Sequence, residues 1–210
     1  MNLNNPKFWD KQFKKEWKLM KSEHINGAMG YRWDGLRFDT MGTHIPTRGS
    51  LLDVGCGLGN FCRYIKARNP ALDVVGIDYS KFAIKKAKTL AKNIDYMVAD
   101  AFHLPFEDNT FDVISVQEIV EHVEKPKELL LEMKRVLKRK GVLLLTTPWK
   151  IGDTLMSEEH IQEWTPIEFK EISKGIFDDS KTASPIIIPY DVLNKRPLPP
   201  NWFLVRFVKT

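Results

Sequence analysis

The sequence predicts an α/β fold in which a mostly parallel sheet carries helices on both faces. Short apolar runs alternate with amphipathic segments from residue 50 to residue 145, and the connections between them are short. Alternation of this kind produces right-handed crossovers, so consecutive strands run parallel. Runs such as VLLL (142–145) are apolar throughout, as expected of strands that are buried on both faces.

The elements of this core are expected in a regular order. An apolar run that ends in glycine or an acid indicates a strand, and apolar residues at helical spacing indicate a helix. The expected strands are SLLDV (50–54), DVVGID (73–78), IDYMVAD (94–100), FDVISVQ (111–117) and GVLLLTTP (141–148). The expected helices are NFCRYIKARN (60–69), SKFAIKKAKTLAKN (80–93) with Ser80 as its N-cap, and PKELLLEMKRVLK (126–138) with Pro126 in its first turn.

The two flanks of the core have their own patterns. PKFWDKQFKKEWKLMKSE (6–23) carries an aromatic stripe at helical spacing, which predicts an amphipathic helix packed as core or lid, and GYRWDGLRFDTMG (30–42) predicts a second short helix. Two β-rich runs near the end, SPIIIPYDVLN (184–194) and NWFLVRFVK (201–209), predict an antiparallel pair that closes the sheet edge. We therefore expect one domain over residues 1–210, made of a helical cap (1–45), a core (50–148), a lid or acceptor segment (149–180) and a closing hairpin (184–210).

Composition excludes several classes of protein. The 210 residues, 43% of them hydrophobic and 28% charged, suit one globular domain, and no apolar run approaches the ~20 residues that a membrane span needs. The N-terminus lacks the apolar core of a secretory signal, and the two cysteines lack metal-ligand spacing, so we expect a cytoplasmic protein with reduced thiols. The net charge of +5 is spread along the chain, which leaves RNA open as a partner without favouring it.

The stretch LLDVGCGLGN (51–60) predicts a ligand-binding loop, for which three kinds of ligand are candidates. A phosphate loop needs a lysine after the glycines, and none is present. A dinucleotide site needs glycines at i, i+2 and i+5, whereas Gly55, Gly57 and Gly59 fall at i, i+2 and i+4. The third ligand is S-adenosylmethionine, which has no phosphate and presents a carboxylate and an ammonium at its methionine end.

Three acids at strand ends favour this third ligand. Asp53, just before the glycines, can accept a hydrogen bond from the ammonium or brace the loop. Asp78 ends the second strand about twenty residues further on, the spacing at which an acid meets ribose hydroxyls. Asp100 ends the third strand and can accept from the adenine amino group, with Ala101 beside it. A single strand-end acid is usually a helix cap or a solvent residue, but three in register with the loop point to one site.

These runs, together with VADAFHLPFEDNTFDVISVQEIVEHV (98–123) and KELLLEMKRVLKRKGVLLLTTP (127–148), resemble the class I S-adenosylmethionine-dependent methyltransferases, in particular the group that shares the EHV element. The resemblance covers roughly residues 50–148 and implies a Rossmann-like sheet of about seven strands, the last of them antiparallel. One minor departure is LKRKG, where the family usually has LKPGG. The resemblance implies cofactor-binding roles for Asp53, Gly55, Gly57, Gly59, Asp78, Tyr79, Asp100, Ala101 and Gln117.

The segment QEIVEHV (117–123) supplies the candidate catalytic residues. Glu118, Glu121 and His122 share one face if the segment is helical, and the imidazole of His122 has a pKa suited to general-base work. The ExxEH pattern with the later His160 is also similar to the small-RNA 3′-terminal 2′-O-methyltransferases, in which two glutamates and two histidines hold a divalent ion, and ubiquinone-biosynthesis O-methyltransferases carry a related ExxEH. We expect metal-free chemistry; the ligands of a metal, if one is bound, would be Glu118, Glu121, His122 and His160.

The sequence therefore predicts a cytoplasmic S-adenosylmethionine-dependent methyltransferase that acts on a small molecule at oxygen or nitrogen. A small acceptor is favoured because no appended RNA-binding module is visible. Two alternatives stay open: a metal-assisted RNA 2′-O-methyltransferase, and a non-catalytic cofactor-binding subunit that stabilises a partner. A nicotinamide dehydrogenase is disfavoured by the glycine spacing.

Overall fold

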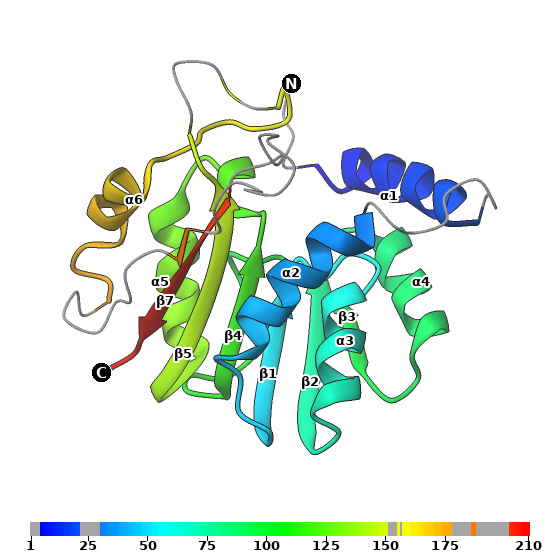
Figure 1. The fold of residues 1–210 in the computed structure, drawn as a ribbon, viewed down its shortest axis with the longest axis horizontal. Helices are drawn as coiled ribbons and strands as arrows, with labels where there is room; N and C mark the ends of the chain where they lie inside the picture. The colour runs from blue at the N-terminus through cyan, green and yellow to red at the C-terminus, as the bar shows by residue number, and fades with distance from the viewer. Residues whose placement is uncertain (1–4, 22–29, 151–154, 156, 178–185, 188–201) are drawn as a thin grey trace, which may run out of the picture. The chain divides into compact units, whose positions relative to one another are not determined.

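The computed structural model describes residues 5–21, 30–150, 155, 157–177, 186–187 and 202–210 (Figure 1). Parts of the expected lid and closing hairpin, at 151–154, 178–185 and 188–201, lie outside the described residues. The chain divides into two compact units, residues 1–105 and 106–210, and each is described by itself.

The first unit is built on three parallel strands. β2 pairs in parallel with β1 on one side and β3 on the other. Helix α3 packs on β2, and α4 packs on β2 and β3 (Figure 1). The elements in chain order are α1 (Pro6–Lys21), α2 (Gly30–Gly42), β1 (Gly49–Val54), α3 (Asn60–Arg68), β2 (Leu72–Asp78), α4 (Lys81–Leu90) and β3 (Asp95–Val98).

Local chemistry accounts for these elements. The side chains of Leu51, Leu52 and Ile77 are almost wholly buried, as the apolar strands predict. Ser80 caps α4, because its hydroxyl accepts a hydrogen bond from the backbone N–H of Ala83 at 3.0 Å. The two expected N-terminal helices are both present, and α1 packs against α4 while α2 packs against α3. The alternation of strand and helix read from the sequence is therefore confirmed.

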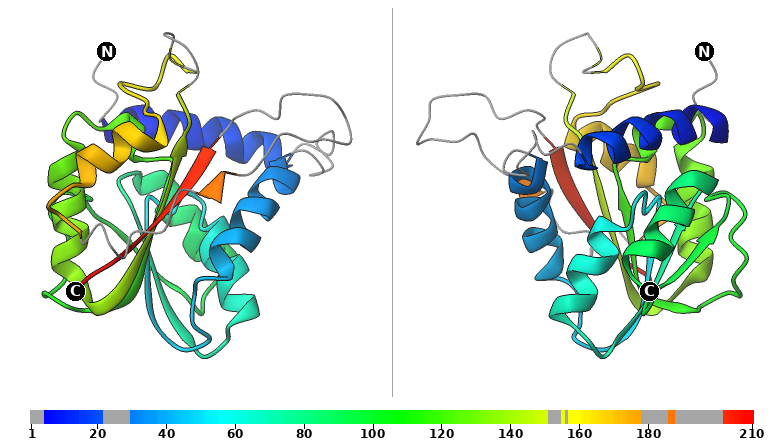
Figure 2. Two further views of the ribbon diagram at one scale, coloured as in Figure 1. Left: turned by 60° about the vertical axis from the view of Figure 1, so that its left-hand side comes forward. Right: turned by 90° about the vertical axis from the view of Figure 1, so that its right-hand side faces the viewer.

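The second unit contains the antiparallel strand that the sequence predicts. β4 and β5 pair in parallel, β7 runs antiparallel to β5, and β6 runs antiparallel to β7. Figure 2 shows β7, in red, running beside β5, and α6 lying near α5. The elements in chain order are β4 (Phe111–Gln117), the 3-10 turn η1 (Val120–His122), α5 (Pro126–Val136), β5 (Leu137–Pro148), α6 (Pro166–Ser173), β6 (Ile186–Ile187) and β7 (Trp202–Val208).

One boundary differs from the prediction. The sequence predicts a helix to residue 138 and a strand from 141, but α5 ends at Val136 and β5 begins at Leu137. Leu137 pairs with Phe111 and Val142 pairs with Val113, so β5 carries extra residues at a bulge, where Lys140 adopts a left-handed φ of 64°. Sequence patterns do not indicate this bulge, because a bulge has no apolar period of its own.

Within the described part of the chain, no helix has the length and apolar character needed to cross a membrane.

Candidate functional site

The glycine loop between β1 and α3 is left-handed at every glycine. Gly55, Gly57 and Gly59 have φ values of 68°, 52° and 76°, which residues with a Cβ adopt only under strain. A Cβ on Gly59 would also lie 2.8 Å from the ring carbon Cζ of Tyr96. The backbone N–H of Cys56 donates to the carbonyl of Ile77 at 2.8 Å and ties the loop to β2. At these three positions the loop therefore offers backbone with no side chain in the way, and the side chains of Cys56 and Leu58 between them are buried.

Asp78, at the end of β2, joins this loop to the start of α4. Its Oδ2 accepts a hydrogen bond from the Gly57 backbone N–H at 2.8 Å, and its Oδ1 accepts one from the Ser80 N–H at 2.7 Å. Burial raises the pKa of the carboxyl to about 6, with smaller contributions from the nearby acids Asp53 and Asp10, while the two backbone hydrogen bonds oppose the rise. Asp78 is therefore ionised at pH 7. One lone pair of Oδ2 holds the glycine loop and one lone pair of Oδ1 holds the start of α4, which leaves a second lone pair on each oxygen.

Asp53 braces the loop from behind. The side chain is 2% exposed, and its Oδ2 accepts a hydrogen bond from the thiol of Cys62 at 3.1 Å. Burial raises the pKa of the thiols of both Cys62 and Cys56, so both stay protonated and can donate. The sequence left two roles open for Asp53, and this hydrogen bond supports bracing.

Asp100 and its neighbours lie just beyond β3, which ends at Val98, two residues earlier than the sequence predicts. Its Oδ1 accepts a hydrogen bond from the Phe102 N–H at 3.0 Å, and its Oδ2 lies 3.1 Å from the imidazole Nδ1 of His103. The carboxyl is part-exposed, as is Ala101. Tyr79, the remaining candidate of this unit, is 38% exposed. These residues could therefore contact a ligand without rearrangement of a buried core.

Sequence reasoning missed the part that α1 plays in this unit. Asp10 accepts hydrogen bonds from the Ser80 hydroxyl and from the Phe82 backbone N–H at 3.0 Å. Phe13, one turn further along, lies against Gly57. The aromatic stripe predicted that α1 packs on something, but no local pattern connects Asp10 to a serine 70 positions away.

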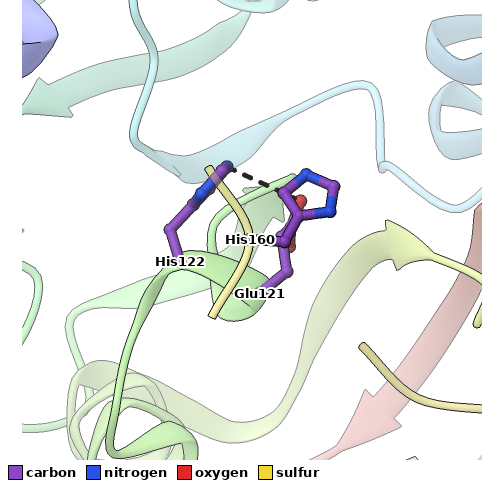
Figure 3. A group of neighbouring side chains, drawn as sticks. All are labelled: Glu121, His122 and His160. Atoms are coloured by element: carbon purple, nitrogen blue, oxygen red, sulfur yellow. Dashed lines mark ion pairs between the residues drawn. The ribbon is translucent and has the colours of Figure 1, made fainter. Parts of the chain in front are cut away.

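The second unit brings together three of the four candidate metal ligands, two of which are also candidate catalytic residues. Glu121, His122 and His160 point toward one another (Figure 3), and their ligand atoms all lie within 4.8 Å of one another. The carboxylate of Glu121 is fully buried, and it accepts a hydrogen bond from the Thr147 hydroxyl at 3.0 Å. The two imidazole rings have centroids 5.0 Å apart. A carboxylate and two imidazoles are a donor set that first-row divalent metals bind.

The two histidines present defined nitrogens to this cluster. His122 Nδ1 lies 2.9 Å from the carbonyl oxygen of Glu159, which can only accept, so Nδ1 carries the proton and Nε2 keeps a lone pair. Burial lowers the pKa of His122, and the neighbouring His160 lowers it further, so the ring is neutral at pH 7. His160 Nδ1 hydrogen-bonds to the carboxylate of Glu163. A neutral His122 can act either as a base or as a metal ligand.

Glu118 adopts a conformation that differs from the expectation, whereas Gln117 does not. Gln117 is the last residue of β4, as predicted. Glu118 follows it at a left-handed φ of 52°, and its N–H donates to the carbonyl of Thr146 at 3.0 Å. The segment is a 3-10 turn that starts only at Val120, so the expected helical face shared with Glu121 does not form, and Glu118 is not in the group of three.

Comparison with known proteins identifies the core. Residues 52–145 match the family described as "Methyltransferase domain". The match covers less than half of the chain, and over these residues the chain resembles a methyltransferase domain. The PH0226 protein from Pyrococcus horikoshii has the same Rossmann-like fold: its structure matches with a TM-score of 0.69 at 21% identity, over 88% of this chain and 93% of that one.

Two curated relatives are similar over the methyltransferase domain. The demethylmenaquinone methyltransferase of Thermotoga maritima is 36% identical over 95 residues, which are 45% of this chain and 42% of the relative. The chloroplastic tocopherol O-methyltransferase of Arabidopsis thaliana is 31% identical over 133 residues, which are 60% of this chain and 38% of the relative. The chain thus spans less than half the length of either relative.

Proposed function

We propose that the chain is an S-adenosylmethionine-dependent methyltransferase that acts on a small-molecule acceptor at oxygen or nitrogen. The observation that carries the proposal is the pairing of Asp78 with Gly57: a buried, ionised carboxylate is hydrogen-bonded to the glycine loop inside a methyltransferase domain. The names of the relatives, which specify demethylmenaquinone and tocopherol, support a small acceptor.

The cofactor-binding roles follow from the geometry of the first unit. The bare backbone of Gly55, Gly57 and Gly59 suits the methionine end, and the second lone pairs on the Asp78 oxygens suit the two ribose hydroxyls. Tyr79 is assigned beside the ribose, Asp100 and Ala101 beside the adenine, and Gln117 beside the sulfonium. The bound cofactor supplies an activated methyl group, and the protein supplies alignment and exclusion of water.

His122 is the proposed general base for an oxygen acceptor. Its neutral ring and the lone pair on Nε2 allow it to take the proton of a hydroxyl as that oxygen becomes a nucleophile. The buried carboxylate of Glu121 lies 4.0 Å from this nitrogen and would stabilise the imidazolium that forms. Glu118 is kept as a candidate acceptor-side residue.

A second function, metal-assisted methylation of an RNA 2′-hydroxyl, is supported by the cluster of Glu121, His122 and His160. The three side chains fit a divalent ion because one carboxylate and two imidazoles converge within 4.8 Å. An ion held there would act as a Lewis acid on a ribose hydroxyl. We place this function second because the fourth predicted ligand, Glu118, does not join the group.

Both units are proposed to serve one catalytic domain over residues 1–210, with residues 1–45 as cap, 50–148 as core, 149–180 as lid and 184–210 as closing hairpin. A cytoplasmic location is proposed because Cys56 and Cys62 are free thiols, as expected in a reducing compartment.

The test is transfer of a labelled methyl group from S-adenosylmethionine to a panel of phenols, quinols, amines and short RNA. Each acceptor is assayed with EDTA and again with added manganese. Label on a small acceptor in EDTA supports the first function. Label on RNA only with manganese, lost in His160→Ala, supports the second. Cofactor binding with no transfer to any acceptor would leave the non-catalytic partner subunit as the better account.

A further inference from the structure

Helix α1 is fixed to the start of α4 by one carboxylate. Asp10 accepts hydrogen bonds from the Ser80 hydroxyl and the Phe82 N–H, and both donors lie at the N-terminus of α4, where the helix dipole favours a negative charge. The backbone N–H of the same Ser80 donates to Asp78 at 2.7 Å. Asp10 and the proposed ribose-binding residue Asp78 are therefore hydrogen-bonded to the same serine, Ser80.

The same face of α1 also touches the glycine loop. Phe13 lies one turn after Asp10, and residues three apart share a helix face. The Phe13 ring is so close to Gly57 that a Cβ on that glycine would lie 2.9 Å from the ring carbon Cε1. The N–H of Gly57 is meanwhile turned toward Asp78. One helix face thus contacts both the methionine-side loop and the ribose side of the proposed site.

The rest of the α1 contact surface is partly open. Among the α1 side chains that the structure describes, at positions 6–18, none is fully buried. Two of the further contacts with α4 are cation–π pairs: the ammonium of Lys86 lies 4.8 Å from the Trp17 ring, and the ammonium of Lys14 lies 5.7 Å from the Phe82 ring. Such partly exposed pairs contribute about 0.5–1 kcal/mol each.

We propose that Phe13 and Asp10 are cofactor-positioning residues: α1 is a lid in which Phe13 covers the methionine end of S-adenosylmethionine and Asp10 latches the helix in place. The inference rests on the proposed function. Methyl transfer needs water excluded from the sulfonium, whereas release of the spent cofactor needs the site to open. A helix with half-buried aromatics and the Asp10 latch meets both needs, because a bound ligand adds apolar surface for Phe13 to cover.

The experiment measures S-adenosylhomocysteine dissociation from the full chain by stopped-flow tryptophan fluorescence. Phe13→Ala and Asp10→Ala should each raise the dissociation rate and the Kd about tenfold, equivalent to about 1.4 kcal/mol. Asp10→Asn, which keeps an acceptor oxygen, should recover most of the loss. Lys11→Ala is the matched control, because Lys11 is exposed on the same helix.

The outcomes separate this inference from the function it rests on. If the unchanged chain does not bind S-adenosylhomocysteine, the proposed function fails. If it binds, and Phe13→Ala and Asp10→Ala release the ligand at the same rate as Lys11→Ala, the lid is refuted and the function stands. Hydrogen exchange on the unchanged chain covers the case in which the variants do not fold: the ligand should slow exchange of the α1 amides, and equal exchange with and without ligand would also refute the lid.

Discussion

Replacement of Asp78 by asparagine tests the cofactor site most sharply, because the carboxylate has two structural partners and two proposed ligand partners. Each oxygen already accepts one backbone N–H, from Gly57 and from Ser80. A carboxylate offers about four lone-pair positions, so one on each oxygen is left for a ribose hydroxyl. In Asp78→Asn, one of those oxygens becomes an NH₂ group, which opposes a backbone N–H and cannot accept from the ribose.

The size of the effect follows from this count. A hydrogen bond to a charged group contributes about 1.5–3 kcal/mol, and at least one such bond to the ribose is lost. The Kd for S-adenosylhomocysteine at pH 8 should therefore rise about 10- to 150-fold by isothermal titration. Asp73→Asn is the control, since Asp73 is an exposed acid on the same strand. An Asp78→Asn Kd within about twofold of the unchanged chain, or an equal loss in Asp73→Asn, would refute the assignment.

The raised pKa of Asp78 adds a pH dependence with a definite sign. The folded protein binds a proton at this carboxyl as the pH falls through about 6, instead of near 3.8. S-adenosylhomocysteine affinity should therefore weaken below pH 6, and this dependence should vanish in Asp78→Asn. For folding without ligand the sign is opposite: the stability that the protonated group contributes is present below pH 3.8 and is lost as the pH rises through about 6. An affinity that is flat from pH 8 to pH 5 would contradict this account.

Three further predictions concern the glycine loop, the proposed general base His122 and the N-cap of helix α6. Gly59→Ala should lower the free energy of unfolding, measured in urea, by about 1–3 kcal/mol more than Gly175→Ala does. Both glycines have φ near 77°, but only the new Cβ at position 59 would collide with Tyr96. Equal losses in the two variants would refute the collision. His122→Asn should lower kcat for an oxygen acceptor about 100-fold or more and leave the Kd for S-adenosylhomocysteine unchanged. In the unchanged chain, the acid limb of the kcat–pH profile should lie below pH 6.5, because burial lowers the His122 pKa. An unchanged kcat in His122→Asn would exclude His122 as the base. Thr165→Ala should lower the stability by about 1 kcal/mol, seen as a lower Tm, since Thr165 forms the capping box of α6; an unchanged Tm would show that the cap contributes nothing measurable.

The sequence predicted most of the fold because each core element has its own local pattern. The strand FDVISVQ was placed with the bounds that β4 has in the structure, and Ser80 was identified as the cap of α4. The predicted start of β5 was wrong, since Lys138 to Lys140 are the extra residues of a bulge, which leaves no periodic signal. The antiparallel strand β7 was predicted from its apolar run together with the family resemblance.

The site was predictable wherever its residues lie next to strand ends. Asp78 was placed correctly, but its hydrogen bonds to Gly57 and Ser80 are tertiary contacts that spacing alone does not give. The helical face expected for Glu118 fails because that residue takes a left-handed conformation before the 3-10 turn. The contacts of Asp10 were not predicted, because its partners lie about 70 residues away, beyond any local pattern.

Isothermal titration of the unchanged chain with S-adenosylhomocysteine and, separately, with NAD tests the central claim most directly. The glycine spacing and the lone pairs of Asp78 predict saturable one-to-one binding of the thioether and no heat from the dinucleotide. Saturable binding of NAD with none of S-adenosylhomocysteine would show that the loop is built for a pyrophosphate.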